Sequence, residues 1–382
     1  MNISEARVRI ECSEELGLLT EAATNYLRDK STVEEARKLA ETETGYDTGT
    51  WQELADMGWL GLAVPEEFGG SGLGMPELTK VCELMGRFLF SSPFLANTLA
   101  TQAILQSKSD NHIQDWVSDL CSGSKIATLA LTEPANDSWE PTEISSTATK
   151  NGDSYTLAGT KNFVLDGQNS DAIIGSFLID GKPALILLDA ATTASLDQLN
   201  EHLVHHARRS TRIDFDGVSV PASAVLATGD EATRILQHVF SLAYILISAD
   251  MAGTANGGLE LTLDYARVRE QFGKHIGSYQ AVSHPLVNGM LLIEDSLSLI
   301  YYAATVFDGT WGGESEIAGR MAKSRSAEAA DLIGRRAIQS HGGMGFTWEC
   351  HAHLYMKRGQ WGQYAYGDPT HQRRHLAALI ID

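Results

Sequence analysis

The chain has 382 residues, of which 43% are hydrophobic and 20% are charged. This is the composition of an ordinary globular protein of about two or three domains, and it excludes a disordered or fibrous chain. The formal charge of −20 repels nucleic acid and anionic membranes, so neither is expected as a partner.

Residues 1–125 are predicted to form an N-terminal helical domain. EEARKLAETE contains strong helix formers, and WQELADMGWLGL has the apolar spacing of an amphipathic helix. The turn-rich segment VPEEFGGSGLGMPE separates helices, and a new helix is expected near Pro76. The first residues lack the basic start and apolar run of a signal peptide, so a cytoplasmic location is expected.

Residues 126–230 are predicted to form a central antiparallel β domain. Short β-favouring runs are separated by turn residues: KIATLALTEP, DSYTLAGTKNFVL, SDAIIGSFLI, KPALILLD and STRIDFDGVSVP. The cluster HLVHHARRSTR at 202–212 lacks metal-ligand spacing on one element. We interpret this cluster as a solvated turn before a strand, with a phosphate-facing basic patch as the alternative.

Residues 231–382 are predicted to form a C-terminal helical domain, with helices near 231–269, 280–307 and 314–341. The longest apolar run, 239–249, is shorter than the ~20 residues that span a bilayer, so no membrane segment is expected. The order of helices, strands and helices predicts an α+β fold.

The familiar metal and hydrolase patterns are absent from the sequence. There is no G-x-S-x-G, no Walker loop and no H-E-x-x-H. The four cysteines, Cys12, Cys82, Cys121 and Cys350, lie far apart without a C-x-x-C pair, which favours reduced thiols over disulfides or zinc. No metal site is predicted.

Two C-terminal segments could bind a ligand. In YARVREQFGKHIGSYQAV, Arg269 lies near a helix end beside a glycine break, where a guanidinium can hold a phosphate; a surface salt bridge fits equally well. In IQSHGGMGFTWE, three glycines let a ligand or another backbone approach closely. A simple helix end and turn is the alternative for that segment.

In chain order, six segments resemble the acyl-CoA dehydrogenase family, and the resemblance covers nearly the whole chain. They are WQELADMGWLGLAVPEEFGGSGLG, LALTEP, GTKNFVLDGQNSDAIIG, FDGVSVPASAVL, YARVREQFGKHIGSYQAV and IQSHGGMGFTWECHAHLYMKR. The resemblance implies an N-terminal helical domain, a central β domain and a C-terminal four-helix bundle. It also implies FAD between the β domain and the bundle, and a tetramer built from dimers.

The resemblance assigns residues to the two ends of FAD. Arg269 would reach the pyrophosphate of a neighbouring subunit's FAD, and the adenosine side would be completed by Phe272, Gln280, Gln339 and Gly343. Along the flavin ring it places Leu131, Thr132, Ser138 and Phe163. Two departures appear: Asp137 replaces a usual glycine, and Leu165 falls where a threonine often bonds flavin N5.

The resemblance implies α,β-dehydrogenation of an acyl-CoA, with an electron-transfer flavoprotein or similar acceptor. A carboxylate would remove the α proton while a hydride leaves the β carbon for the flavin. Most members carry this base near the C-terminus, where Gly367 stands here, and a minority carry it where Ala243 stands. The nearest acids are Asp250 and Asp368, which are the candidate catalytic bases of this sequence.

Three functions follow from this pattern. The chain is an acyl-CoA dehydrogenase with a displaced base, acting alone or as one subunit of a heterotetramer. Alternatively, it is a non-catalytic subunit that completes the FAD site of an unlike partner, as in bacterial sterol and bile-acid side-chain enzymes. The third possibility is a flavin-dependent oxygenase, which would need no α-proton base.

Overall fold

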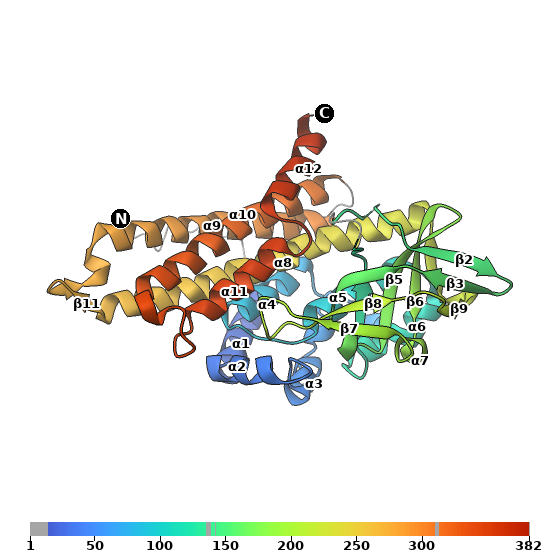
Figure 1. The fold of residues 1–382 in the computed structure, drawn as a ribbon, viewed down its shortest axis with the longest axis horizontal. Coiled ribbons are helices and arrows are strands. Elements are labelled where there is room, and N and C mark those ends of the chain that lie inside the picture. The colour runs from blue at the N-terminus through green and yellow to red at the C-terminus, as the bar shows by residue number, and fades with distance from the viewer. Residues whose placement is uncertain (1–13, 135–138, 142, 310–312, 382) are drawn as a thin grey trace.

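The computed structural model describes residues 14–134, 139–141, 143–309 and 313–381. A helical part, a β part and a second helical part follow one another along the chain (Figure 1). This order confirms the predicted α+β fold. The last helix of the first part ends at Cys121, and the first strand begins at Ala127. The domain boundaries at 125/126 and 230/231 stay predictions.

From residue 14 on, the N-terminal part contains the α-helices α1 (Glu14–Lys30), α2 (Val33–Glu41), α3 (Thr48–Asp56), α4 (Met75–Arg87), α5 (Phe94–Gln106) and α6 (Asp110–Cys121). Side-chain oxygens cap the N-termini of α2 and α3: that of Thr32 accepts a hydrogen bond from the Glu35 amide, and that of Asp47 accepts one from the Thr50 amide. The start of α4 next to Pro76 confirms the expected helix, because proline suits the first helical turn.

Helix α4 packs directly on the long helix α8 (Asp230–Val268). Two glycines allow this approach: a Cβ at Gly253 would lie 1.8 Å from the Glu83 carbonyl oxygen, and one at Gly86 would lie 2.1 Å from that of Asp250. Any larger residue would force the two backbones apart. The N-terminal part is therefore fixed against the C-terminal helices.

The described residues of the β part form two sheets. In the larger sheet the strands run β10-β6-β5-β2-β3-β9, with β1 paired to β5, and the smaller sheet runs β4-β8-β7. The strands are β1 (Ala127–Ala130), β2 (Thr147–Asn151), β3 (Ser154–Ala158), β4 (Thr160–Leu165), β5 (Ala172–Ile179), β6 (Lys182–Leu188), β7 (Asp197–Glu201), β8 (Ser210–Asp214), β9 (Ser219–Pro221) and β10 (Val225–Thr228). A short helix, α7 (Ala190–Thr193), follows β6.

The pairing is mainly antiparallel, as predicted, but β5 pairs in parallel with β1 and, at one residue pair, with β2. Apolar side chains from both sheets form one buried cluster, in which Phe177 of β5 meets Phe215 edge to face at 5.4 Å. The two sheets are therefore held together by an apolar core.

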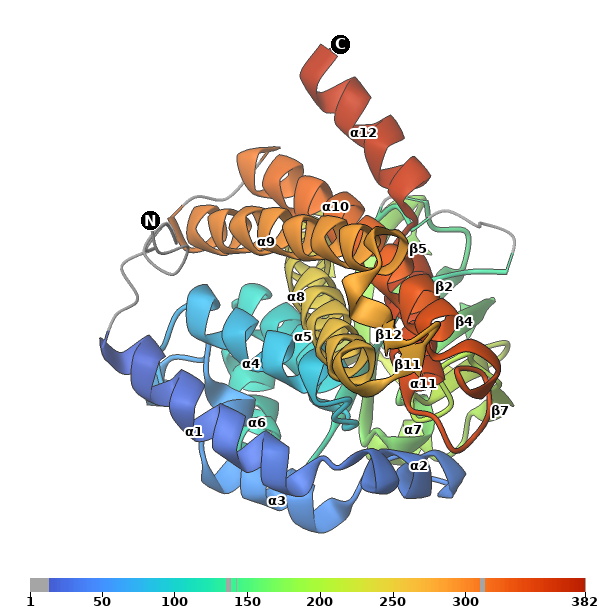
Figure 2. The same ribbon diagram turned by 90° about the vertical axis from the view of Figure 1, so that its left-hand side faces the viewer.

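The C-terminal part contains α8, α9 (Gln280–Gly309), α10 (Gly313–His341), α11 (Ala352–Tyr364) and α12 (Pro369–Ile381). These bounds confirm the three predicted helices within a few residues. Helices α8 to α11 pack side by side, while α12 projects away from the bundle (Figure 2). The hairpin β11 (Glu270–Gln271) and β12 (Lys274–His275) lies between α8 and α9 in the chain.

By length and composition alone, α8 and α9 could each cross a membrane. The apolar stretch of α8 is 94% buried inside the protein, as in the core helix of a globular fold. That of α9 is only 28% buried. Among the described residues, helix α9 therefore leaves an apolar face that other parts of the chain do not cover.

Candidate functional site

The residues assigned to the two ends of FAD lie at opposite ends of the folded molecule. Figure 1 shows the β11–β12 hairpin at one end of the long axis and the β sheets at the other. Arg269 and Phe272 belong to the hairpin end, whereas Thr132 and Phe163 belong to the β part. One chain cannot hold both ends of a single FAD with these residues.

The hairpin end presents its side chains to solvent. Arg269 follows α8 and its side chain is exposed, while its amide donates to the Tyr265 carbonyl at 2.9 Å. Phe272 lies in the hairpin turn with a φ of 54° and is 93% exposed. Gln280 begins α9 and is also exposed. An aromatic ring held this far out of its own chain is suited to contact with another chain.

The glycine-rich segment after α10 lies beside the same hairpin end. The rings of Tyr265 on α8 and His341 on α10 stack at 4.3 Å, which joins the ends of these helices. Gln339 and Gly343 are exposed next to this stack in sequence, and a Cβ at Gly343 would meet nothing within 4 Å. All five residues assigned to the nucleotide end therefore face outward, with space for a ligand to approach.

The ring end is built from β1 and β4. Thr132 follows β1, and its carbonyl oxygen accepts from the Asn162 amide at 2.8 Å. Leu131 is partly buried beside it. Phe163 lies at an irregularity of β4 with a φ of 54°, and its amide donates to Glu201 at 2.9 Å. Ser138 lies outside the described residues.

Two aromatic residues that the sequence analysis did not single out fill this end. Tyr366 is 5% exposed and stacks on Trp139 with ring centroids 4.9 Å apart. The cavity that they line together with Leu131, Thr132 and Phe163 has a volume of about 10 Å³. That is room for about one water molecule. A three-ring flavin does not fit there.

A second cavity of about 180 Å³ adjoins the stack on its outer side. It is lined by Trp139, Phe163 and Tyr366 together with residues of α11 and of the segment before β8. The two cavities share the lining residues Trp139, Phe163, Leu165 and Tyr366, whereas Thr132 borders the smaller cavity. Of the residues assigned to the flavin ring, Phe163 therefore borders both spaces.

Gly367, one of the two positions that the family resemblance singles out for the base, has a backbone that disfavours a side chain. Its φ is +90°, a conformation that residues other than glycine rarely adopt. A Cβ there would lie 2.4 Å from Cδ2 of His371. Ala243, at the other usual place, is fully buried inside α8. Neither position carries a carboxylate.

A buried lysine holds the Gly367 segment in place. The ammonium of Lys323 on α10 donates to the carbonyl oxygens of Gly367 at 3.0 Å and Gln363 at 3.1 Å. Burial lowers the pKa of Lys323 to about 7, although the Asp368 carboxylate opposes this shift. A buried lysine with a lowered pKa therefore lies next to Gly367.

Asp250 is buried on α8 between two arginines. Its carboxylate accepts from Arg208 at 3.0 Å and from Nε of Arg358 at 3.0 Å. Burial alone would raise the pKa of Asp250, but the guanidinium groups of Arg358 and Arg208 outweigh it and lower the pKa below its usual range. A carboxylate held this way is a weak proton acceptor.

Asp368 lies at the start of α12. Its Oδ1 accepts from the His371 amide at 2.8 Å, and its carbonyl oxygen accepts from the Gln372 amide at 2.9 Å. These are the contacts of a residue that caps a helix N-terminus. Its carboxylate is thus engaged by the backbone of its own helix.

Two further signals were present in the sequence but were not recognised. Tyr366 directly precedes Gly367, and Trp139 directly follows Ser138. Each therefore adjoins a residue that the resemblance to the family singles out. Their stacking could not be read from the sequence, because they come from different parts of the chain.

Two family profiles define the class of this chain, a flavoprotein oxidoreductase. Residues 13–124 match the family profile "Acyl-CoA dehydrogenase, N-terminal domain", and residues 233–381 match "Acyl-CoA dehydrogenase, C-terminal domain". Together these matches cover more than half of the chain. The chain belongs to the acyl-CoA dehydrogenase family, whose cofactor is FAD.

Among curated relatives, the chain is 26% identical over 370 residues to acyl-CoA dehydrogenase IpdE2 of Mycolicibacterium smegmatis, covering 97% of this chain and 100% of that one. It is 28% identical over 383 residues to acyl-CoA dehydrogenase FadE27 of Mycobacterium tuberculosis, covering 97% and 98%.

Two solved structures are similar over nearly their full length. The ChsE4–ChsE5 complex from Mycobacterium tuberculosis aligns with a TM-score of 0.87 and 26% identity, covering 96% of this chain and 97% of that one. The Tcur3481–Tcur3483 steroid ACAD aligns with a TM-score of 0.85 and 28% identity, covering 96% and 98%. Each is named for two different polypeptides.

Proposed function

We propose that this chain is the non-catalytic subunit of a heteromeric acyl-CoA dehydrogenase, in which it completes the FAD site of an unlike partner. The observation that carries the proposal is the stack of Trp139 on Tyr366. It leaves about 10 Å³ beside Thr132, where the chain's own flavin ring would lie. The partner would hold the flavin ring, the acyl thioester and the base.

The environments of two carboxylates, Asp250 and Asp368, also support a non-catalytic role for this chain. A general base must reach the substrate proton and must have a pKa near the working pH. Asp250 is paired with Arg208 and Arg358, which lower its pKa, and Asp368 caps α12. In this proposal both carboxylates have structural roles, and neither removes the α proton.

The exposed hairpin end is the part of this chain that would complete the partner's FAD site. Arg269 would meet the pyrophosphate of the partner's FAD, because a guanidinium forms strong charge-assisted bonds to phosphate oxygens. Phe272, which is 93% exposed, would gain cover from the partner. These groups would make the chain necessary for FAD binding without making it catalytic.

The uncovered face of α9 supports assembly with other chains. Val287, Met290 and Leu291 are 49%, 44% and 54% exposed, and two of them line an apolar cavity of about 430 Å³ between α8 and α9. Contiguous exposed apolar surface of this kind is typical of a subunit interface. We propose a heterotetramer, in keeping with the two-polypeptide names of the neighbouring structures.

The substrate in this proposal is an acyl-CoA thioester. The name of one neighbour, a steroid ACAD, favours a steroid or other bulky lipid acyl chain. Electrons would pass from the partner's FAD to an electron-transfer flavoprotein or a similar acceptor. All of this chemistry would take place on the partner's side of the shared site.

The test is to purify the full chain alone and with the similar polypeptide that copurifies with it, and to count FAD per chain. The chain alone should hold almost no FAD, and the complex should hold one FAD per two chains. Arg269→Ala should lower FAD retention by the complex at least tenfold. Arg267→Ala, an exposed arginine two residues earlier that pairs with Asp264, is the matched control and should leave retention unchanged.

A chain that binds stoichiometric FAD by itself and oxidises an acyl-CoA with an artificial acceptor would refute the proposal. So would a complex whose turnover drops when Asp368→Asn is introduced into this chain. The oxygenase hypothesis is tested in the same preparation, by supplying reduced flavin and oxygen and looking for an oxygenated product.

A further inference from the structure

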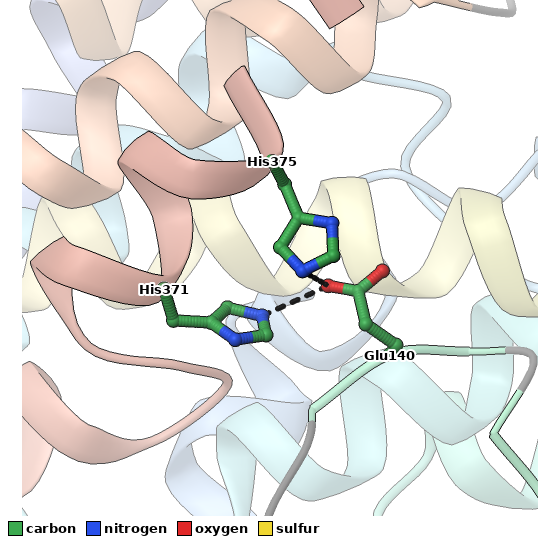
Figure 3. Close-up of side chains that lie close together, drawn as sticks. All are labelled: Glu140, His371 and His375. Atoms are coloured by element: carbon green, nitrogen blue, oxygen red, sulfur yellow. Dashed lines mark hydrogen bonds and ion pairs between the residues drawn. The ribbon is translucent and has the colours of Figure 1, made fainter. Parts of the chain in front are cut away.

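Two histidines and one glutamate converge where α12 leaves the bundle (Figure 3). His371 and His375 lie one turn apart on α12, and Glu140 comes from the segment that follows β1. One ligand atom from each of the three lies within 4.8 Å of the other two. None of these side chains belongs to the FAD residues assigned above.

The spacing of the three atoms is close to that of a metal site. Nε2 of His371 lies 2.8 Å and Nε2 of His375 lies 3.4 Å from the same oxygen of Glu140. Ligands of tetrahedral zinc, at 2.0–2.1 Å from the ion, lie about 3.3 Å from one another. Small rotamer changes would therefore place all three atoms around one ion.

The local charges are compatible with a divalent cation. Arg320 binds Glu140 at 3.1 and 3.2 Å, but it also pairs with Glu316 at 2.8 Å, so one guanidinium is shared by two carboxylates. A hydrogen-bonded carboxylate remains a competent ligand, and such outer contacts orient it. The His375 side chain is 34% exposed, which leaves a side open for the ion and a water ligand.

We propose that Glu140, His371 and His375 bind one divalent transition-metal ion of the zinc type. Two imidazoles and one carboxylate are a ligand set that zinc accepts, with water in the fourth position. The ion would join α12 to the segment after β1. It would thus restrain both sides of the aromatic stack, since Trp139 adjoins Glu140 and Tyr366 lies five residues before His371.

The test is calorimetric titration of the full chain, stripped with a chelator, with Zn²⁺. One ion per chain should bind, and the temperature of unfolding should rise with zinc concentration, because an ion that binds only the folded state stabilises it. Co²⁺ should give the visible absorption of a four-coordinate site. His371→Gln and His375→Gln should each weaken zinc binding at least tenfold, as expected for loss of one ligand.

His112→Gln is the matched control, since this histidine lies on α6 and bonds only to Ser109 among its described partners. It should bind zinc as the native chain does. Absence of binding overturns the proposal, as does unchanged affinity in a His375→Gln chain that unfolds at the native temperature. His375 is partly exposed, so its substitution should preserve the fold. Zinc binding is measured without FAD or a partner, so its failure is distinguishable from failure of the proposed function.

Discussion

Trp139 and Tyr366 stack with ring centroids 4.9 Å apart and an interplanar angle of 25°. They come from the segment after β1 and the segment between α11 and α12, so the contact joins the β part to the C-terminal helices. Phe240 of α8 packs edge to face on Tyr366 at 5.2 Å. This relationship limits the free space beside Thr132.

Opening the stack should let the isolated chain take up flavin. We expect Trp139→Ala to cost about 3 kcal/mol of unfolding free energy while raising FAD binding by the purified chain, because the cavity beside Thr132 enlarges. Denaturant titration and equilibrium dialysis measure the two effects. Trp51→Ala, which breaks the Tyr46–Trp51 contact in the N-terminal part, is the control and should destabilise without any gain of FAD. Equal FAD binding by both variants would contradict a blocking role.

Restoring the family's glutamate should not restore activity. Gly367→Glu should destabilise the chain by about 1–3 kcal/mol for its strained backbone, plus the cost of displacing His371. We expect no acyl-CoA oxidation by this variant alone. Gly217→Glu is the control, because its φ is +82° and a Cβ there meets nothing within 4 Å. It isolates the backbone strain, so equal losses in the two variants would mean that the contact with His371 is unimportant.

Removing the charge of Asp250 should lower the free energy of unfolding. Asp250→Asn removes the carboxylate that both buried guanidinium groups, Arg208 and Arg358, bond to, and we expect a loss of about 3–5 kcal/mol near neutral pH. The folded chain lowers the pKa of Asp250, so its contribution is complete above the ordinary pKa of about 3.9 and is lost as the pH falls further.

The difference between the native chain and Asp250→Asn should therefore shrink in acid, as followed by denaturant unfolding at several pH values. Asp264→Asn removes an exposed partner of Arg267 and should change stability by less than about 0.5 kcal/mol. A similar effect of both substitutions would argue against the buried ion-pair role.

Lys323 should make the free energy of unfolding depend on pH in the neutral to alkaline range. Its pKa is about 7 in the folded chain and about 10.4 when unfolded, so the unfolded chain binds the extra proton between these values. Stability from this group should therefore rise from about pH 7 to pH 10. The rise should be absent in Lys323→Met and present in Lys150→Met, whose side chain is exposed. A parallel pH profile for native chain and Lys323→Met would refute the shift.

The sequence was sufficient for the architecture. Helix formers, β-favouring runs and turn residues predicted three parts in order, and α8, α9 and α10 lie within a few residues of their predicted bounds. Family motifs also predict that Arg269 and Phe272 lie at the nucleotide end of FAD, and this assignment stays a prediction. Those features are local or depend on short motifs. The parallel pairing of β1 with β5 was not predicted, because strand direction depends on contacts between distant segments.

The sequence by itself also predicted that the usual base is missing, since Gly367 and Ala243 have no carboxylate to offer. Only the tertiary structure decided the surroundings of these positions. It places Asp250 between two arginines, Lys323 next to the Gly367 carbonyl, and Trp139 against Tyr366. Likewise, the four-residue spacing of His371 and His375 is visible in THQRRH, but Glu140 joins them only through folding. Burial and proximity between distant segments set the charge and the free space of a site, and neither is encoded in local spacing.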